Sequence, residues 1–156
     1  MEKKISFIGL GAMGGPMATN VIKKGIELVV YDIDENKKNK VVKEGGINSK
    51  NILEATKNAE IVITMLPATE QVKNVLLGEN GVIKNLNKKS LILDMSTISP
   101  KGTDEIAAEC KKNQLCFIDA PVGRLVSHAI SGESLFMVGC DDENDFEQVK
   151  PVLDAM

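Results

Sequence analysis

Short, uninterrupted apolar runs alternate along this chain with longer amphipathic stretches. The first pattern predicts strands that are buried on both faces, and the second predicts helices that cover those faces. The predicted strands are Ile5–Ile8, Leu28–Tyr31, Ile61–Leu66, Leu91–Met95, Leu115–Ile118 and Leu135–Val138. The predicted helices are Met13–Lys24, Glu35–Lys43, Ile52–Lys57, Glu70–Leu77, Pro100–Lys112 and Asp142–Ala155.

This alternation predicts an α/β fold of the Rossmann type, a doubly wound and mostly parallel sheet with helices on both faces. The 156 residues give room for about one domain, and residues 1–156 are expected to form it. Ser99 and Pro100 are typical of a helix start, because serine caps free N–H groups and proline fits the first turn. The last predicted helix runs to the end of the chain, which indicates a chain cut at a domain boundary or within a longer element.

Composition and charge exclude several classes of protein. Hydrophobic residues make up 43% and charged residues 26%, which is ordinary for a globular domain. The net charge of -3 gives no attraction to nucleic acid. No apolar run approaches the roughly 18 residues of a membrane span, and the N-terminus lacks the features of a signal peptide. We therefore expect a cytoplasmic protein with no nucleic-acid partner and no membrane partner.

The cysteines and the histidine give no sign of a metal site. Cys110, Cys116 and Cys140 form no C-x-x-C pair, and His128 is the one histidine, so we expect no tetrahedral zinc site. We interpret the cysteines as buried thiols in a reducing cytosol. The lysine cluster at positions 37–40 is interpreted as the solvated face of a helix.

A glycine-rich turn is the first candidate for chemistry. Between the first predicted strand and the first predicted helix lies a G-x-G-x-x-G motif, Gly9-Leu10-Gly11-Ala12-Met13-Gly14. This is the context of a dinucleotide-binding site. Gly9 permits the tight turn, Gly11 lets a pyrophosphate approach the backbone, and Gly14 lets the helix pack on the strand. The phosphates would lie at the helix N-terminus, where free N–H groups and the helix dipole favour an anion.

An acidic residue stands at the distance that this motif requires. Asp32 ends the second predicted strand, 23 positions after Gly9. A carboxylate there accepts hydrogen bonds from the ribose hydroxyls of adenosine and repels the 2′-phosphate of NADP. Asp34 and Glu35 add negative charge, and no arginine or adjacent lysine follows. We therefore predict NAD as the cofactor, with NADH preferred over NADPH.

Three further strand ends are expected at the same crevice, because ligands bind beyond the carboxyl ends of parallel strands. Leu66-Pro67 would flank the adenosine half of the cofactor, Ser96-Thr97 offers hydroxyl groups, and residues 119–124 form the third end. Arg124 is the one arginine among 19 basic residues, and its planar guanidinium suits an anion with several oxygens. The alternative is a surface arginine or an ion pair with Asp119 or Glu133.

Together these stretches resemble the β-hydroxyacid dehydrogenase family, which includes 3-hydroxyisobutyrate dehydrogenase and tartronate semialdehyde reductase. The matching runs are FIGLGAMGGPMA (Phe7–Ala18), TMLP (Thr64–Pro67), GENGV (Gly78–Val82), DMSTISP (Asp94–Pro100) and DAPV (Asp119–Val122). The resemblance implies an NAD(P)-binding Rossmann domain followed by an all-helical domain, and the reversible oxidation of a β-hydroxy acid to its semialdehyde. The cofactor residues that it implies are Gly9, Leu10, Gly11, Ala12, Met13, Gly14, Asp32, Leu66, Pro67, Gln71 and Thr97, with Thr97 near the nicotinamide.

Two departures from the family pattern bear on the substrate and on catalysis. Where the family has Ser-Gly-Gly after the DAPV run, this chain has Gly123-Arg124-Leu125, a variant that resembles the sulfolactaldehyde reductase branch. We expect Ser96, Gly123 and Arg124 to bind the substrate. The family's catalytic lysine lies in an interdomain helix, beyond Met156, so no catalytic residue is expected in this chain and the chain alone is expected to be inactive. The full protein would be a homo-oligomer through its helical domain.

Other functions remain open on the sequence. One alternative substrate is an ordinary carboxylate semialdehyde, as in tartronate semialdehyde reductase or 3-hydroxyisobutyrate dehydrogenase. A dinucleotide-binding or sensing domain without chemistry belongs to a different class, and the missing lysine leaves that class open. A methyltransferase that uses S-adenosylmethionine is disfavoured by the complete glycine motif and by Thr97. No Ser-His-Asp set is visible in the sequence.

Overall fold

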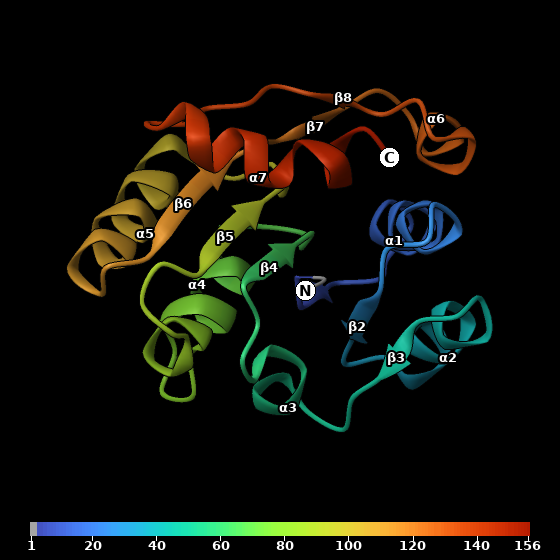
Figure 1. Ribbon diagram of the computed structural model, residues 1–156, viewed down its shortest axis with the longest axis horizontal. Coiled ribbons are helices and arrows are strands. Elements are labelled where there is room, and N and C mark those ends of the chain that lie inside the picture. Colours follow the sequence, from blue (N-terminus) through green and yellow to red (C-terminus); the bar gives the residue numbers. More distant parts are fainter. Residues whose placement is uncertain (1–2) are drawn as a thin grey trace.

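The computed structural model describes residues 3–156, and its centre is a six-stranded parallel sheet (Figure 1). The strands are β1 (Ile5–Ile8), β2 (Leu28–Tyr31), β3 (Ile47–Asn48), β4 (Ile61–Thr64), β5 (Leu91–Asp94) and β6 (Cys116–Asp119). They lie in the order β3-β2-β1-β4-β5-β6, so the strand order reverses beside β1, as in a doubly wound fold. The predicted Rossmann-type parallel sheet is confirmed.

Helices cover both faces of this sheet. They are α1 (Gly14–Lys23), α2 (Glu35–Lys43), α3 (Ile52–Thr56), α4 (Thr69–Leu77), α5 (Pro100–Lys112), α6 (Val126–Ser131) and α7 (Glu143–Leu153), with the short 3-10 helix η1 (Val82–Asn85). Residues of α1, α2, α6 and α7 belong to one hydrophobic core, and residues of α3, α4 and α5 belong to the other. In Figure 1, α1 and α7 lie above the sheet and α3 and α4 lie below it.

The central strands send successive side chains to opposite cores. On β1, Phe7 packs in the core that contains α1 and α7, whereas Ile8 packs in the core that contains α4 and α5. On β5, Leu93 and Ile92 divide in the same way. Strands buried on both faces are near-continuous apolar runs. For this reason the hydrophobic pattern predicted β1, β2, β4 and β5 to within two residues of their observed ends.

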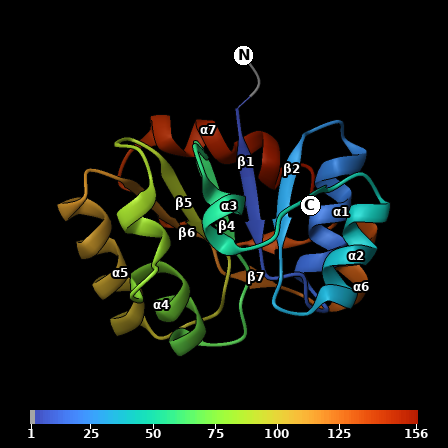
Figure 2. The same ribbon diagram turned by 90° about the horizontal axis from the view of Figure 1, so that it is seen from below.

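The predicted strand Leu135–Val138 is wrong as a member of the parallel sheet. Only Leu135–Phe136 forms a strand, β8, which pairs antiparallel with β7 (Val122–Gly123) in a separate two-stranded sheet. Leu135 and Met137 are 49% and 59% exposed, so this apolar run lies on the surface instead of filling a position buried on both faces. Figure 2 shows β7 beyond the arrowhead of β1, at the edge of the sheet away from the N-terminus.

The prediction that the lysine cluster at 37–40 is the solvated face of a helix is wrong for Lys38. This side chain is only 2% exposed, because α2 packs over the loop after β3. Its Nζ donates hydrogen bonds to Glu35 Oε1 at 2.7 Å and to the Ser49 carbonyl at 2.9 Å. It also lies 5.9 Å from the centre of the Tyr31 ring. Both hydrogen bonds and the aromatic ring compensate the cost of burying the ammonium group.

The expectation of three buried thiols holds for Cys110 alone. Cys116 is half-buried and Cys140 is exposed, because the segment after β8 runs over the surface. Burial raises the pKa of Cys110 to about 12 and that of Cys116 to about 11. Across residues 3–156, none of the helices combines the length and the apolar composition needed to cross a lipid bilayer.

Candidate cofactor-binding site

The turn between β1 and α1 needs glycine at two positions for packing and leaves a third position open. Gly9 has a left-handed φ of 96°, and a Cβ there would overlap the Met65 carbonyl. A Cβ on Gly14 would overlap the Gly9 carbonyl. At Gly11 a Cβ would meet nothing within 4 Å. Gly9 and Gly14 therefore let strand and helix approach each other, whereas Gly11 leaves the surface free for a ligand.

The start of α1 presents unpaired backbone donors to that open space. The N–H of Gly15 donates to the Gly11 carbonyl at 3.0 Å, and Pro16 has no N–H to offer. Within residues 3–156, the N–H groups of positions 11–14 have no hydrogen-bond acceptor. Free N–H groups at a helix N-terminus, together with the helix dipole, bind phosphate groups. This part of the structure therefore fits the pyrophosphate of a dinucleotide.

Asp32, at the end of β2, fastens the glycine turn. Its Oδ2 accepts a hydrogen bond from the N–H of Leu10 at 2.6 Å, and its Oδ1 accepts one from the N–H of Asp34 at 2.8 Å. Each carboxylate oxygen keeps a lone pair for a further donor, so the ribose contact predicted from the sequence fits. The bond to Leu10 was missed, because it joins residues 22 positions apart and no local pattern signals it.

A hydrogen-bond network joins the ends of β4 and β5. Asp94, the last residue of β5, is fully buried, and its Oδ1 accepts from Thr64 Oγ1 at 2.8 Å and from the Ser96 N–H at 3.1 Å. The hydroxyl oxygen of Ser96 accepts from the Leu66 N–H at 2.9 Å. Ser96 is itself fully buried, so the structure places this predicted substrate residue beneath the surface, whereas Thr97 beside it is exposed.

Two carboxyl groups at this edge have perturbed pKa values. Burial raises the pKa of Asp94 above its ordinary value, although hydrogen bonds from Ser96 and Thr64 act in the opposite direction. Burial and the neighbouring charge of Asp94 raise the pKa of Asp119, its partner in register on β6. Ligands of such sheets bind at the carboxyl ends of the strands, and perturbed carboxyl groups cluster at functional sites.

The segment after β6 carries two of the three predicted substrate residues, Gly123 and Arg124, and rests on α1. Arg124 is exposed, has a left-handed φ of 71°, and donates from Nη1 to the Glu133 carbonyl at 2.9 Å. It therefore bonds to the main chain of Glu133 and forms no ion pair with that carboxylate. Asn20 of α1 donates from Nδ2 to the Ala129 carbonyl of α6 at 2.7 Å. The helix that presents its N-terminus to the phosphates thus also supports the segment that follows Arg124.

Sheet order brings these features together. The ends of β2, β1, β4, β5 and β6 are consecutive neighbours, and each carries predicted site residues or leads into them. Gln71 lies exposed on α4, the helix that follows β4. Two surface cavities, of about 440 and 430 Å³, lie elsewhere: one between α4, η1 and α5, the other between α7 and the starts of β1 and β4. Neither is part of the carboxyl edge.

Residues 4–156 match the protein family described as the NAD binding domain of 6-phosphogluconate dehydrogenase. The chain belongs to this family of NAD-binding domains. Among its relatives, the 3-sulfolactaldehyde reductase of Escherichia coli (strain K12) is 42% identical over 152 residues, which are 97% of this chain and 51% of that protein. The 3-hydroxyisobutyrate dehydrogenase of Pseudomonas aeruginosa is 37% identical over 152 residues, 97% of this chain and 51% of that protein.

A solved structure agrees with this assignment. The 3-hydroxyisobutyrate dehydrogenase of Mycobacterium tuberculosis with L-serine superposes on the NAD-binding domain with a TM-score of 0.92 and 32% sequence identity. The match covers 100% of this chain and 52% of that one. The NAD-binding domain thus spans about half the length of the relatives it matches. The resemblance to β-hydroxyacid dehydrogenases noted in the sequence is confirmed.

Proposed function

We propose that this NAD-binding domain is the cofactor half of an oxidoreductase that interconverts a β-hydroxy acid and its semialdehyde. The observation that carries the proposal is the turn of residues 9–14, which offers free N–H groups beside the ends of β2, β4 and β5. The bound nicotinamide supplies or accepts the hydride. The glycine turn holds the pyrophosphate, Asp32 holds the adenosine ribose, and Thr97 lies near the nicotinamide.

Calorimetry with the 156-residue chain tests this proposal. We expect NADH to bind and no semialdehyde to be reduced, because the family's catalytic lysine lies beyond Met156. Failure to bind NADH contradicts the proposal. Oxidation of NADH by the chain alone contradicts the role given to that lysine. If the full-length protein binds NADH and reduces no semialdehyde, the result favours the alternative function, a sensing domain without chemistry.

Asp32 supports a preference for NADH over NADPH. Its carboxylate is held by two backbone N–H groups at the end of β2, where it would face the 2′-phosphate of NADPH, and like charges repel. We expect NADPH to bind more weakly by about 1–3 kcal/mol. Dissociation constants for both nucleotides measure the difference, and equal constants contradict it. Asp32→Asn, which keeps an oxygen acceptor and removes the charge, is expected to narrow the gap.

Arg124 supports a sulfonated substrate, 3-sulfolactaldehyde. Its bond to the Glu133 carbonyl uses one donor and holds the guanidinium, and a guanidinium has five donors in all. A planar fork of donors matches an anion with several oxygens better than an ammonium does. Gly123, just before it, adds no side chain that would obstruct such an anion. The alternative substrate remains a carboxylate semialdehyde, as in the 3-hydroxyisobutyrate or tartronate semialdehyde enzymes.

Steady-state kinetics of the full-length protein separates these substrates. We expect kcat/KM for sulfolactaldehyde to exceed the values for methylmalonate and tartronate semialdehydes. Arg124→Lys is expected to lower kcat/KM for the sulfonate by about 1–3 kcal/mol of transition-state binding, and to affect the carboxylates less. An equal loss for both substrates, or none, contradicts the assignment of Arg124 and returns the substrate to a carboxylate semialdehyde.

An exposed apolar surface supports the helical second domain implied by the resemblance. Its six residues, all between 38% and 69% exposed, are Leu125, Val126, Ile130, Leu135, Met137 and Val138. An apolar surface of this kind marks an interaction site, and this one starts beside Arg124. We propose that the helical domain packs over it, in a cytoplasmic homo-oligomer. Hydrogen exchange at 125–138 is expected to be slower in the full-length protein than in this chain, and equal exchange contradicts the packing.

A further inference from the structure

Asp94 is an unfavourable group at the centre of the strand ends. Its side chain is 0% exposed, and its neighbours in register are Thr64 on β4 and Asp119 on β6. Only Oδ1 is bonded, and within residues 3–156 its Oδ2 has no hydrogen-bond partner. Burying a carboxyl group with an unsatisfied oxygen costs free energy. We therefore expect Asp94 to have a role besides packing in the core.

Those contacts connect two predicted cofactor residues. Oδ1 bonds to Thr64 on β4 and to the Ser96 N–H just beyond β5, and the Ser96 hydroxyl oxygen in turn accepts the Leu66 N–H. The bonds close a ring between the ends of β4 and β5. Leu66 belongs to this ring and Thr97 directly follows Ser96; Leu66 is half-buried and Thr97 is exposed.

We propose that Asp94 is a positioning residue for the cofactor, and that its carboxylate holds the ends of β4 and β5 so that Thr97 meets the nicotinamide half. This inference rests on the proposed binding of NAD. With a side chain that cannot accept hydrogen bonds at position 94, Thr64 Oγ1 and the Ser96 N–H become buried donors without acceptors. Such donors force the backbone to shift toward other partners or water, and the end of β5 carries Thr97 with it. The end of β4, with Leu66, stays held to β1 because the Met65 N–H donates to the Ile8 carbonyl at 2.9 Å.

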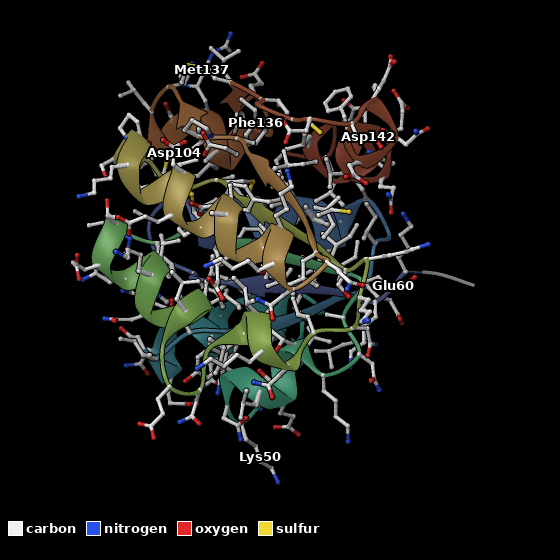
Figure 3. All side chains as sticks on the ribbon, turned by 90° about the vertical axis from the view of Figure 1, so that its left-hand side faces the viewer. Lys50, Glu60, Asp104, Phe136, Met137 and Asp142 are labelled. Atoms are coloured by element: carbon white, nitrogen blue, oxygen red, sulfur yellow. The ribbon has the colours of Figure 1, made fainter. Side chains whose placement is uncertain are left out.

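Two nucleotides separate positioning from general support of the fold. NADH and ADP-ribose share the adenosine ribose and the pyrophosphate, which the glycine turn and Asp32 hold, but ADP-ribose lacks the nicotinamide. The variants are Asp94→Ala, which removes the acceptor, and Asp94→Asn, which keeps an oxygen in place of Oδ1. Asp104→Asn on α5 is the matched control, because Asp104 is exposed (Figure 3). Calorimetry on the 156-residue chain gives the dissociation constants.

We expect Asp94→Ala to raise the dissociation constant of NADH at least about fivefold and that of ADP-ribose by less than about twofold. Asp94→Asn is expected to restore NADH binding to within about twofold of wild type, as for Asp104→Asn. The emission of bound NADH gives a second readout. Because the chain has no Trp, this emission reports the nicotinamide, and in Asp94→Ala it is expected to move toward the spectrum of free NADH.

Three results overturn the proposal. Equal weakening of NADH and ADP-ribose in Asp94→Ala assigns Asp94 to the general fold, and unchanged affinity for both assigns it no role. If Asp94→Ala does not fold, Thr64→Val removes one bond of the ring without changing side-chain size, and the same selective loss of NADH is expected. Unselective loss there overturns the proposal as well. The proposed function is tested separately with the wild-type chain alone. If that chain binds neither NADH nor ADP-ribose, the proposed function is refuted.

Discussion

Gly9, Gly11 and Gly14 lie in one turn but differ in the space available for a side chain. Substitution by alanine, which adds one methyl group, tests this difference. Gly11→Ala adds the methyl group to open space, whereas Gly14→Ala drives it into the Gly9 carbonyl. We expect Gly11→Ala to leave the free energy of unfolding within about 1 kcal/mol of wild type and to weaken NADH binding, because the methyl group occupies the path of the pyrophosphate. Gly14→Ala is expected to lose about 1–3 kcal/mol of stability. Urea unfolding and calorimetry measure both, and equal stability of the two variants contradicts the distinction.

Asp94 makes stability depend on pH in a direction that its raised pKa fixes. The unfolded chain releases this proton near the ordinary Asp value of 3.8, whereas the folded chain holds it to higher pH. The burial cost is therefore fully present above the folded-state pKa and fades as pH falls from there toward 3.8. Asp94→Asn carries no charge, so we expect it to be more stable than wild type at pH 8, by on the order of 1 kcal/mol.

This advantage of Asp94→Asn is expected to shrink as the pH is lowered from 8 to 4. Melting temperatures of both proteins across that range measure it. Asp104→Asn, on the exposed face of α5, serves again as the control and is expected to follow wild type. A difference between Asp94→Asn and wild type that stays constant with pH would show that Asp94 keeps its ordinary pKa in the folded chain.

Among the secondary-structure elements, the apolar strands of the parallel sheet were predictable, including the edge strand β6, whereas the shortest elements were not. The strands β1, β2, β4 and β5 are near-continuous apolar runs, and Ser99 caps α5 as expected, accepting the Gly102 N–H at 3.1 Å. By contrast, the apolar run at 135–138 belongs to a surface strand pair, and β3, β7, η1 and α6 were not predicted at all. These elements have two to six residues, too few for a periodic pattern, and their form depends on contacts distant in sequence.

The candidate site also has residues that could be predicted from the sequence and residues that could not. The glycine motif and Asp32 were predictable, because the chemistry of phosphate and ribose binding fixes residue types at a local spacing. The network of Thr64, Asp94 and Ser96 was not, because two of its three bonds join residues 30 positions apart. The burial of Ser96 could not be read from the sequence either, since a serine after an apolar strand is equally compatible with an exposed hydroxyl. Sheet pairing decides which side chains at a strand end face inward.

One hydrogen bond couples the cofactor helix to the segment that carries Arg124. Asn20 of α1 donates to the Ala129 carbonyl of α6, and Ala129 is fully buried. We expect Asn20→Ala to lower the free energy of unfolding by about 1–2 kcal/mol, because it leaves that carbonyl unsatisfied. Hydrogen exchange in residues 126–131 should also become faster. Asn39→Ala, on the exposed face of α2, is the control and should change stability by less than about 0.5 kcal/mol. Unchanged exchange in Asn20→Ala contradicts the coupling.

For the molecule as a whole, the uneven distribution of exposed apolar side chains has a consequence in solution. Among residues 3–156, six of the nine exposed large hydrophobic residues lie within residues 125–138. Met137 lies at the outer edge of the molecule in Figure 3. We expect the 156-residue chain to self-associate as its concentration rises, because this surface is open. Ile130→Lys combined with Met137→Lys should suppress the association and leave NADH affinity unchanged. Sedimentation velocity measures the first effect, and a wild-type chain that stays monomeric at all concentrations contradicts the expectation.

The three thiols give this protein a built-in attachment point for a fluorescent label. Alkylating reagents attack the thiolate. Burial raises the pKa of Cys110 to about 12 and that of Cys116 to about 11, so both remain thiols at pH 7. Cys140 is exposed and follows Gly139, whose backbone is bridged to Asp119 at the end of β6. A maleimide dye should therefore modify Cys140 alone, without engineering. From that position its emission would report, in real time, changes in the surroundings of the β6 end, which leads to Arg124, as a nucleotide or an anionic aldehyde is added.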